Sequence, residues 1–225
     1  MVKMERVSKI YKTNSVETHA LRELSIEIGG GEFVAITGTS GSGKSTFLNI
    51  AGLLEEHTSG RYELDGTDVS TLGDRQRSLL RNTRIGFIFQ SFNLIPDLSI
   101  EDNVSVPLRY RRMSMQECRQ RTVSALRVVG LSGRAGHLPA QLSGGQQQRA
   151  AIARAIAGGP AILFADEPTG NLDSEMAAGV LQLLVDLHRR GTCIVLVTHD
   201  QEIAAHAQRR VRIEDGRIIR DEGGI

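Results

Sequence analysis

The sequence predicts an α/β fold in which apolar strands alternate with helices around a parallel sheet. Phe33–Thr37, Ala161–Ala165 and Cys193–Val197 are short apolar runs, typical of strands that are buried on both faces. Thr46–Ala51 follows the first run and can form a helix, and residues 174–190, between the other two, carry apolar side chains at helical spacing. Strands that alternate with helices in this way indicate βαβ units.

The first third of the chain is expected to be rich in β-structure. Ser25–Ile28 alternates between polar and apolar residues and ends at three glycines. Arg61–Leu64 followed by Asp65 and Gly66 predicts a hairpin, because Asp-Gly favours the tight turns that join antiparallel strands. Arg84–Phe89 is a further strand candidate.

Residues 91–142 are predicted to form a helical insertion in this core. Ser99, with Asp102 three residues later, fits a capping box at the start of a helix. Met115–Val129 has apolar residues at helical spacing, and Gly130 is placed to end that helix.

The α/β core is expected to resume after this insertion. Ser174 can cap a helix that Gly191 ends. Arg210–Glu214 and Arg217–Arg220, joined by Asp215-Gly216, predict a C-terminal hairpin. The apolar stripe of the preceding helix consists of Val180, Leu181, Leu184 and Leu187.

Composition excludes several classes of protein. The chain has 225 residues, a formal net charge of +1 and two cysteines, Cys118 and Cys193. Near-neutral charge does not indicate a nucleic-acid binder, and two distant cysteines indicate neither a disulfide framework nor a metal site. No signal peptide is expected, because the N-terminus is charged from Lys3 onward, and no apolar stretch reaches membrane-spanning length.

Charge is unevenly distributed along the chain. Residues 75–134 contain eleven arginines, no lysine and four acidic residues. Any one of these arginines could simply be solvated, but the excess also predicts a surface that binds acidic partners or anionic lipid headgroups. Arg109, Arg111 and Arg112 are the clustered candidates.

Gly38–Ser45 matches the phosphate-binding pattern G-x-x-x-x-G-K-[ST]. It follows a strand candidate and precedes a helix candidate, which is the context that the motif requires, although a chance glycine-rich turn is the alternative. Backbone N–H groups and the helix N-terminus would hold the phosphates, Lys44 would reach the β- and γ-phosphates, and the Ser45 hydroxyl would bind Mg²⁺. The residues expected to bind the nucleotide here are Gly38, Thr39, Ser40, Gly41, Ser42, Gly43, Lys44, Ser45 and Thr46.

Two acidic residues end the second apolar run. Asp166 and Glu167 would lie at the carboxyl edge of the sheet, where doubly wound folds bind ligands. Asp166 is predicted to hold Mg²⁺ through water, and Glu167 to act as general base for the attacking water. A solvated acidic turn is the alternative for the pair taken alone.

Leu142–Gln146, with the sequence LSGGQ, is a second candidate phosphate-binding helix start. Ser143 is a natural N-cap, and Gly144 and Gly145 allow close approach of the backbone to an anion. One nucleotide does not need two such loops from the same chain, so two chains facing head to tail could each supply one loop to each nucleotide.

With this motif the chain resembles the ATP-binding cassette (ABC) ATPases, the nucleotide-binding subunits of ABC transporters. The LSGGQ residues Ser143, Gly144, Gly145 and Gln146 match the family signature, and Asn171–Asp173 matches its D-loop. The resemblance implies that Tyr11 stacks on adenine, that Gln90 contacts Mg²⁺ or water, and that His199 contacts the γ-phosphate. Taken alone, Tyr11 could be a surface aromatic, Gln90 an ordinary strand-end residue and His199 a helix cap.

The resemblance implies a P-loop NTPase fold of ABC type, with a mixed sheet core, a β-rich subdomain and a helical subdomain. Residues 1–90 and 143–225 would form the core and 91–142 the helical subdomain. It also implies Mg²⁺-dependent ATP hydrolysis in a head-to-tail homodimer that closes on ATP. The partner would be an integral membrane permease, with peripheral association at the cytoplasmic face of the inner (plasma) membrane and no nucleic acid bound.

Gln90–Pro96 and Asp166–Ser174 are similar to the branch that serves lipoprotein release and macrolide export. Two alternatives stay open. One is a cell-division ATPase that acts on a permease-like partner without transport. The other is a soluble ABC ATPase, although those usually carry coiled-coil insertions or two cassettes.

Overall fold

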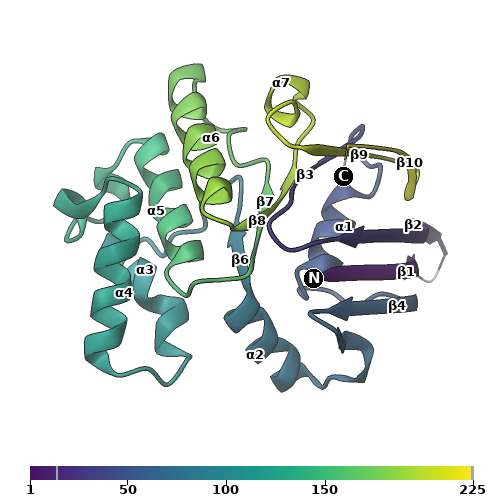
Figure 1. Ribbon diagram of the computed structural model, residues 1–225, viewed down its shortest axis with the longest axis horizontal. Coiled ribbons are helices and arrows are strands. Elements are labelled where there is room, and N and C mark those ends of the chain that lie inside the picture. The colour runs from purple at the N-terminus through teal and green to yellow at the C-terminus, as the bar shows by residue number, and fades with distance from the viewer. Residues whose placement is uncertain (14, 224–225) are drawn as a thin grey trace. The chain divides into compact units, whose positions relative to one another are not determined.

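The structure is a computed structural model that describes residues 1–13 and 15–223 (Figure 1). The chain divides into two compact units. The first unit comprises Met1–Leu79 and Cys193–Ile225, and the second comprises Leu80–Thr192. The subdomain boundaries expected from the sequence, with a helical part at 91–142, stay a prediction.

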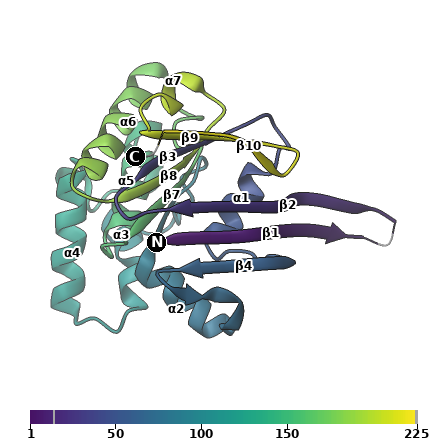
Figure 2. The same ribbon diagram turned by 45° about the vertical axis from the view of Figure 1, so that its right-hand side comes forward.

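An antiparallel sheet opens the first unit, and Figure 2 shows its strands β2, β1 and β4 side by side. The order is β2-β1-β4-β5. Its turn at Asp65 and Gly66 has φ of 51° and 75°, as in a type I′ turn, so the predicted hairpin is confirmed. The strands are β1 (Val2–Lys12), β2 (Glu17–Ile28), β4 (Ser59–Leu64) and β5 (Thr67–Asp68).

A second group of strands in the first unit surrounds β3 (Phe33–Thr37). β3 is parallel to both β8 (Cys193–Val197) and β9 (Arg209–Glu214), and β9 forms the predicted hairpin with β10 (Arg217–Glu222). Every residue of β3 and β8 is buried, which confirms the two apolar runs as central strands. The helical elements of this part are α1 (Lys44–Ala51), the 3₁₀ turn Val69–Thr71, α7 (Gln201–Ala204) and the first part of α2 (Asp74–Arg84), whose residues from Leu80 onward belong to the second unit.

Cys193, at the start of β8, is fully buried, as expected. Burial raises the pKa of its thiol to about 12. The thiol is therefore protonated at neutral pH and acts as an apolar core group rather than as a nucleophile.

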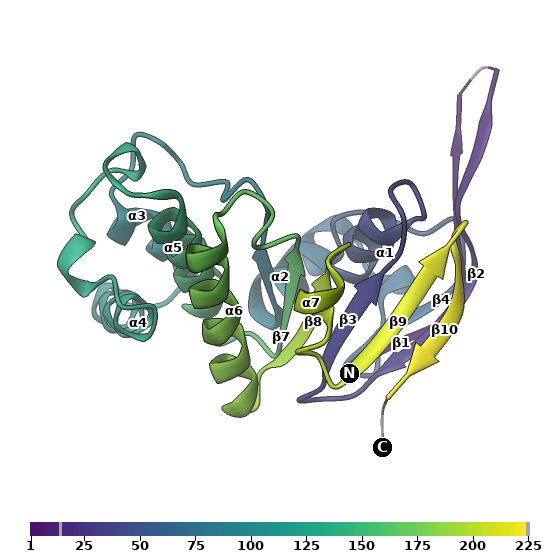
Figure 3. The same ribbon diagram turned by 90° about the horizontal axis from the view of Figure 1, so that it is seen from above.

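The second unit combines two parallel strands with a helical bundle. β6 (Ile85–Ile88) pairs with β7 (Ile162–Asp166) from Ile85↔Ile162 to Ile88↔Ala165. α5 contacts β6, α3, α4 and α6, and Figure 3 shows these helices grouped around it. The helical elements are α3 (Ile100–Arg109), α4 (Met115–Val128), the 3₁₀ turns Ser132–Arg134 and Pro139–Gln141, α5 (Gly144–Ile156) and α6 (Ser174–Arg189).

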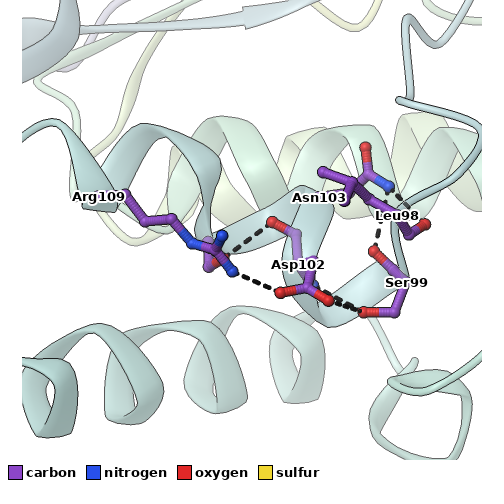
Figure 4. A network of polar contacts seen from close by, with 6 residues as sticks. Leu98, Ser99, Asp102, Asn103 and Arg109 are labelled. Atoms are coloured by element: carbon purple, nitrogen blue, oxygen red, sulfur yellow. Dashed lines mark hydrogen bonds and ion pairs between the residues drawn. The ribbon is translucent and has the colours of Figure 1, made fainter.

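The cap of α3 is confirmed, and Figure 4 shows the polar network around it. Ser99 Oγ accepts a hydrogen bond from the Asp102 amide (3.0 Å) and donates one to the Asp102 carboxylate (2.7 Å). The hydrogen bond that Ser99 Oγ donates is the main cause that lowers the pKa of Asp102, and the ion pair with Arg109 lowers it further. Asn103, which is fully buried, donates to the carbonyl groups of Leu98 and Ser99.

The expected cap of α6 was wrong by one residue. Asp173, not Ser174, is the N-cap, and its carboxylate accepts a hydrogen bond from the Met176 amide (2.9 Å). An aspartate caps at least as well as a serine and carries a charge that favours the helix N-terminus, so the helix begins one residue after it.

In residues 1–13 and 15–223, no helix has the length and apolar character needed to cross a membrane.

Candidate functional site

The phosphate loop lies in the first unit, between β3 and α1, as the motif requires. α1 begins after Gly43, whose φ is 105°, and no side chain caps it. The Lys44 amine donates to the carbonyl groups of Gly38 (2.9 Å) and Thr39 (2.8 Å), so the side chain folds back over its own loop. The loop thus combines an uncapped helix N-terminus with a fixed cation.

The C-terminal hairpin braces the loop from the same unit. The Gly216 amide donates to the Ser42 carbonyl (2.9 Å). A Cβ on Gly43 would lie 2.5 Å from the Ala20 carbonyl oxygen, so β2 approaches the loop too closely for any larger residue. The loop conformation is therefore constrained by its neighbours in the first unit.

The loop residues fit a phosphate and its metal ion. Ser42 Oγ is buried and has no hydrogen-bond partner among the described residues. Ser45, in the first turn of α1, is exposed, so its hydroxyl is accessible to a ligand. A hydroxyl oxygen such as that of Ser45 is one of the oxygen ligands that Mg²⁺ prefers.

Tyr11 lies near the phosphate loop within the first unit. Its hydroxyl donates to the Glu55 carboxylate (2.7 Å) and is also hydrogen-bonded with Thr46 of α1. The Lys9 amine lies 5.0 Å from the ring centroid, within cation–π range. The side chain is 39% exposed, which leaves surface for stacking.

His199 follows β8 in the first unit and is exposed. Thr198, just before it, is buried, and its amide donates to the Ile36 carbonyl at the end of β3 (3.1 Å). α7 is capped by Asp200, whose carboxylate accepts from the Glu202 amide (2.8 Å). The capping role considered for His199 therefore belongs to Asp200.

The two acids lie in the second unit. Asp166 is the last residue of β7, and both side chains are partly buried. Glu167 has φ of 43°, a left-handed conformation that is uncommon outside glycine and frequent at functional sites. Its carbonyl accepts a hydrogen bond from the Gly170 amide (3.0 Å), which closes a tight turn after the strand.

Gln90 and Asn171 bind each other in the same unit. Gln90 Nε2 donates to Asn171 Oδ1 (3.3 Å), and Asn171 Nδ2 donates to the Gln90 carbonyl (3.0 Å). A Cβ on Gly170 would lie 2.7 Å from Gln90 Nε2, so the end of the Gln90 side chain packs closely against Gly170. The structure thus joins the expected Q-loop and D-loop residues.

The LSGGQ residues form the start of α5. Ser143 Oγ accepts from the Gln146 amide (3.4 Å), and Gln146 Oε1 accepts from the Ser143 amide (3.1 Å), a complete capping box. A Cβ on Gly145 would lie 2.9 Å from Met176 Sδ, so α6 packs directly against this helix start.

Each unit therefore carries its own set of candidate residues. Tyr11, the phosphate loop and His199 belong to the first unit, whereas Gln90, the acid pair and the LSGGQ residues belong to the second. Their individual roles toward a nucleotide stay predictions. The sequence did not predict Gln148 and Arg154 of α5, whose side chains bind backbone carbonyl groups next to the candidate residues.

Comparisons with known proteins agree with these motifs. Residues 21–170 match the family model described as ABC transporter. The chain is 44% identical over 224 residues to a Bacillus subtilis protein named uncharacterized ABC transporter ATP-binding protein YvrO, with 100% of this chain and 98% of the relative covered. It is 46% identical over 228 residues to the macrolide export ATP-binding/permease protein MacB of Syntrophobacter fumaroxidans. It covers only 32% of that MacB protein, about a third of its length.

Solved structures give the same result for the fold. A dimeric ABC transporter cassette, MJ0796, matches with a TM-score of 0.91 and 43% identity, with both chains covered completely. A second structure of that cassette, described as a post-hydrolysis state bound to ADP and Pi, matches equally well. Sequence and structure together show that the chain belongs to the ABC transporter family, as an ABC-type ATPase cassette that binds ATP.

Proposed function

We propose that this cassette hydrolyses Mg²⁺-bound ATP in a head-to-tail homodimer and thereby drives a membrane permease. The observation that carries the proposal is the phosphate loop. Its Lys44 amine is held by two loop carbonyl groups beside an uncapped helix N-terminus. Such an arrangement attracts a triphosphate, because both the amine and the helix end are positive.

Different residues of the chain would bind the different parts of the nucleotide. The loop amides and Lys44 bind the phosphates, and Tyr11 stacks on the adenine. Ser45, Asp166 and Gln90 would hold Mg²⁺, which neutralises phosphate charge when bound. Glu167 accepts the proton of the attacking water, and His199 contacts the γ-phosphate.

Dimerisation would complete the site. Ser143, Gly144, Gly145 and Gln146 would contact the ATP held by the other copy, which explains why one chain carries two phosphate-binding helix starts. The dimeric state described for the MJ0796 cassette supports this proposal.

The relatives' names support a permease as the partner. The name of the MacB relatives combines ATP-binding and permease in a single protein. The Bacillus relative is named as an ABC transporter ATP-binding protein. We infer that this cassette couples to a permease and associates peripherally with the cytoplasmic face of the membrane. The branch resemblance favours lipoprotein release or macrolide export as its process.

The test of the hydrolytic mechanism is Glu167→Gln. We expect ATP binding to be retained and turnover to fall by roughly 10²- to 10⁴-fold, the range for loss of a general base. Glu175→Gln, an exposed acid in the first turn of α6, is the control and should turn over normally. Near-normal turnover of Glu167→Gln would rule out this base.

The coupling proposal has a separate test. The tagged chain, purified from detergent-solubilised membranes of its own cells, should bring down a permease that stimulates its ATPase on reconstitution. Full hydrolytic function without any membrane protein bound would favour a soluble ABC machine instead.

A further inference from the structure

Gln148 is a fully buried amide on α5, in the second unit. Its Nε2 donates to the carbonyl of Pro168 (2.6 Å) and to that of Phe89 (3.4 Å). Since both partners are carbonyl groups, the amide nitrogen and not the oxygen must face them. One side chain thus joins two segments that lie far apart in the sequence.

Both bonded residues are neighbours of proposed catalytic residues. Phe89 directly precedes Gln90, and Pro168 directly follows Glu167. The β6–β7 ladder ends at the pair Ile88↔Ala165. Beyond that pair, the Gln148 amide bridges the two chain segments where the strand hydrogen bonds stop.

Arg154, on the same helix, fixes the chain on the other side of Gln90. Its guanidinium donates to the carbonyl groups of Phe92 (2.9 Å) and Asn93. These two residues have φ of 59° and 50°, a left-handed conformation that Asn tolerates but that costs free energy at Phe92. Gln90 therefore lies between two anchor points on α5, one at Phe89 and one at Phe92 and Asn93.

The two hydrogen bonds of Gln148, which bridge Phe89 and Pro168, come with a free-energy penalty that an apolar core residue would avoid. Gln148 Oε1 is buried without a hydrogen-bond partner among the described residues. An unsatisfied buried polar atom costs about 1–3 kcal/mol. A hydrogen-bonding side chain at this position is therefore consistent with a demand for the bridge itself.

We propose that Gln148 is a positioning residue for ATP hydrolysis, which sets the spacing of Gln90 and Glu167. The inference rests on the proposed function. Because α5 starts at Ser143, a displacement of the LSGGQ residues moves the same helix, and Gln148 passes that displacement to both strand ends. The signature helix is thus mechanically joined to the base and to the Q-loop of its own chain.

The test is Gln148→Met, which keeps the side-chain length but removes the donor. We expect kcat to fall by roughly 10- to 100-fold, as a small misplacement of reacting groups produces. KM and the ATP dissociation constant should change by less than about twofold, since the phosphate loop is untouched. If Gln148→Met does not fold, Gln148→Asn takes its place in the test. This variant is one methylene shorter but keeps an amide in the core, and it should show the same loss of kcat.

Asn103→Ala is the matched control. Asn103 is another fully buried amide of the second unit that binds backbone carbonyl groups, at Leu98 and Ser99. Its loss should lower the melting temperature without a specific loss of kcat in the folded protein. A kcat loss in Gln148→Met no greater than that in Asn103→Ala would overturn the positioning role.

Hydrogen exchange of the nucleotide-free protein separates this inference from the proposed function. Gln148→Met should speed exchange in both 86–93 and 166–171, whereas Asn103→Ala should act near 95–99. If the wild-type protein hydrolyses no ATP, the proposed function fails, and unchanged exchange in either 86–93 or 166–171 still overturns the bridge.

Discussion

Two helix starts with phosphate-binding sequences, at α1 and at α5, are built in opposite ways. The start of α1 has a glycine N-cap in a left-handed conformation and no side-chain cap. The start of α5 has a complete capping box between Ser143 and Gln146. The first leaves N–H donors for a ligand, while the second satisfies its own donors within the chain.

This difference indicates different tasks. An uncapped start that is braced by neighbouring strands is ready to bind an anion without rearrangement. A capped start is stable alone and offers its serine hydroxyl and glycine backbone to something that arrives later. That is the behaviour expected if α1 binds the chain's own ATP and α5 meets the ATP of a second copy.

Of the two helix starts, the larger effect is expected at the open start of α1. Lys44→Ala removes the only side-chain cation of the loop, and hydrogen bonds to charged groups contribute about 1.5–3 kcal/mol. ATP affinity should therefore fall by roughly 10- to 100-fold. Equilibrium binding of a fluorescent ATP analogue measures it, with Lys3→Ala, an exposed lysine paired with Glu5, as the control. Equal affinity of Lys44→Ala and wild type would contradict the assignment of the loop.

Ser143→Arg tests whether the capped start acts in trans. Monomer affinity for ATP should change little, because α1 is untouched, but a long cation at the dimer interface should block closure. Hydrolysis should drop at least about tenfold, the equivalent of about 1.4 kcal/mol. A mixture of Ser143→Arg and Lys44→Ala chains should regain activity, since one composite site stays intact. Wild-type turnover by the Ser143→Arg homodimer would show that the two starts do not cooperate.

The two helix starts can also be compared by the thermal stability of variants that each lose one serine hydroxyl. Ser143→Ala removes a cap and should lower the free energy of unfolding by about 1 kcal/mol. That loss corresponds to a melting temperature lower by about 2–4 °C for a domain of this size. Ser45→Ala in the first turn of α1, which has no cap to lose, should leave the nucleotide-free melting temperature nearly unchanged. Equal shifts for the two variants would mean that the starts do not differ in this way.

The elements that could be predicted from sequence are those with a local signal. Apolar runs predicted β3, β7 and β8, and Asp-Gly pairs predicted both hairpin turns. β1 was missed because charged residues and register shifts at Met4/Val7 and Val7/Lys9 break its alternation. α2 was missed because none of its residues is buried, so it has no apolar stripe.

In the candidate site, too, the residues that could be predicted are those with a local sequence signal. The phosphate loop, the acid pair and LSGGQ are contiguous motifs, so they are visible in the sequence. Gln148 and Arg154 act on backbone carbonyl groups of Phe89 and Phe92, about sixty residues away. Nothing in a single sequence identifies such partners, because every residue offers the same carbonyl group.

The prediction for the arginine-rich residues 75–134, with Arg109, Arg111 and Arg112 as one exposed cluster, needs correction. Arg111 is not a solvated side chain. Its guanidinium binds the carbonyl groups of Asn82 and Gly158, and burial lowers its pKa. Arg109 pairs with Asp102 (Figure 4). Arg112 remains exposed, together with Arg119 and Arg127 of α4.

The smallest effects are therefore expected at Arg112, Arg119 and Arg127. Each changed to Ser should alter the free energy of unfolding by no more than about 0.5 kcal/mol, as at other surface positions. Arg111→Ser should cost about 1–3 kcal/mol, because the Asn82 carbonyl loses its Arg111 donor and the Gly158 carbonyl keeps only Arg121. The triple variant, with Arg112, Arg119 and Arg127 all changed to Ser, should keep its basal ATPase activity. It should bind anionic liposomes more weakly, by about 1 kcal/mol for each arginine that contacts lipid headgroups. Raising salt should weaken wild-type binding in the same way, since exposed charges are screened. Liposome sedimentation across a salt series decides the matter, because binding that responds neither to salt nor to the triple change would leave these arginines as a solvated face with no docking role.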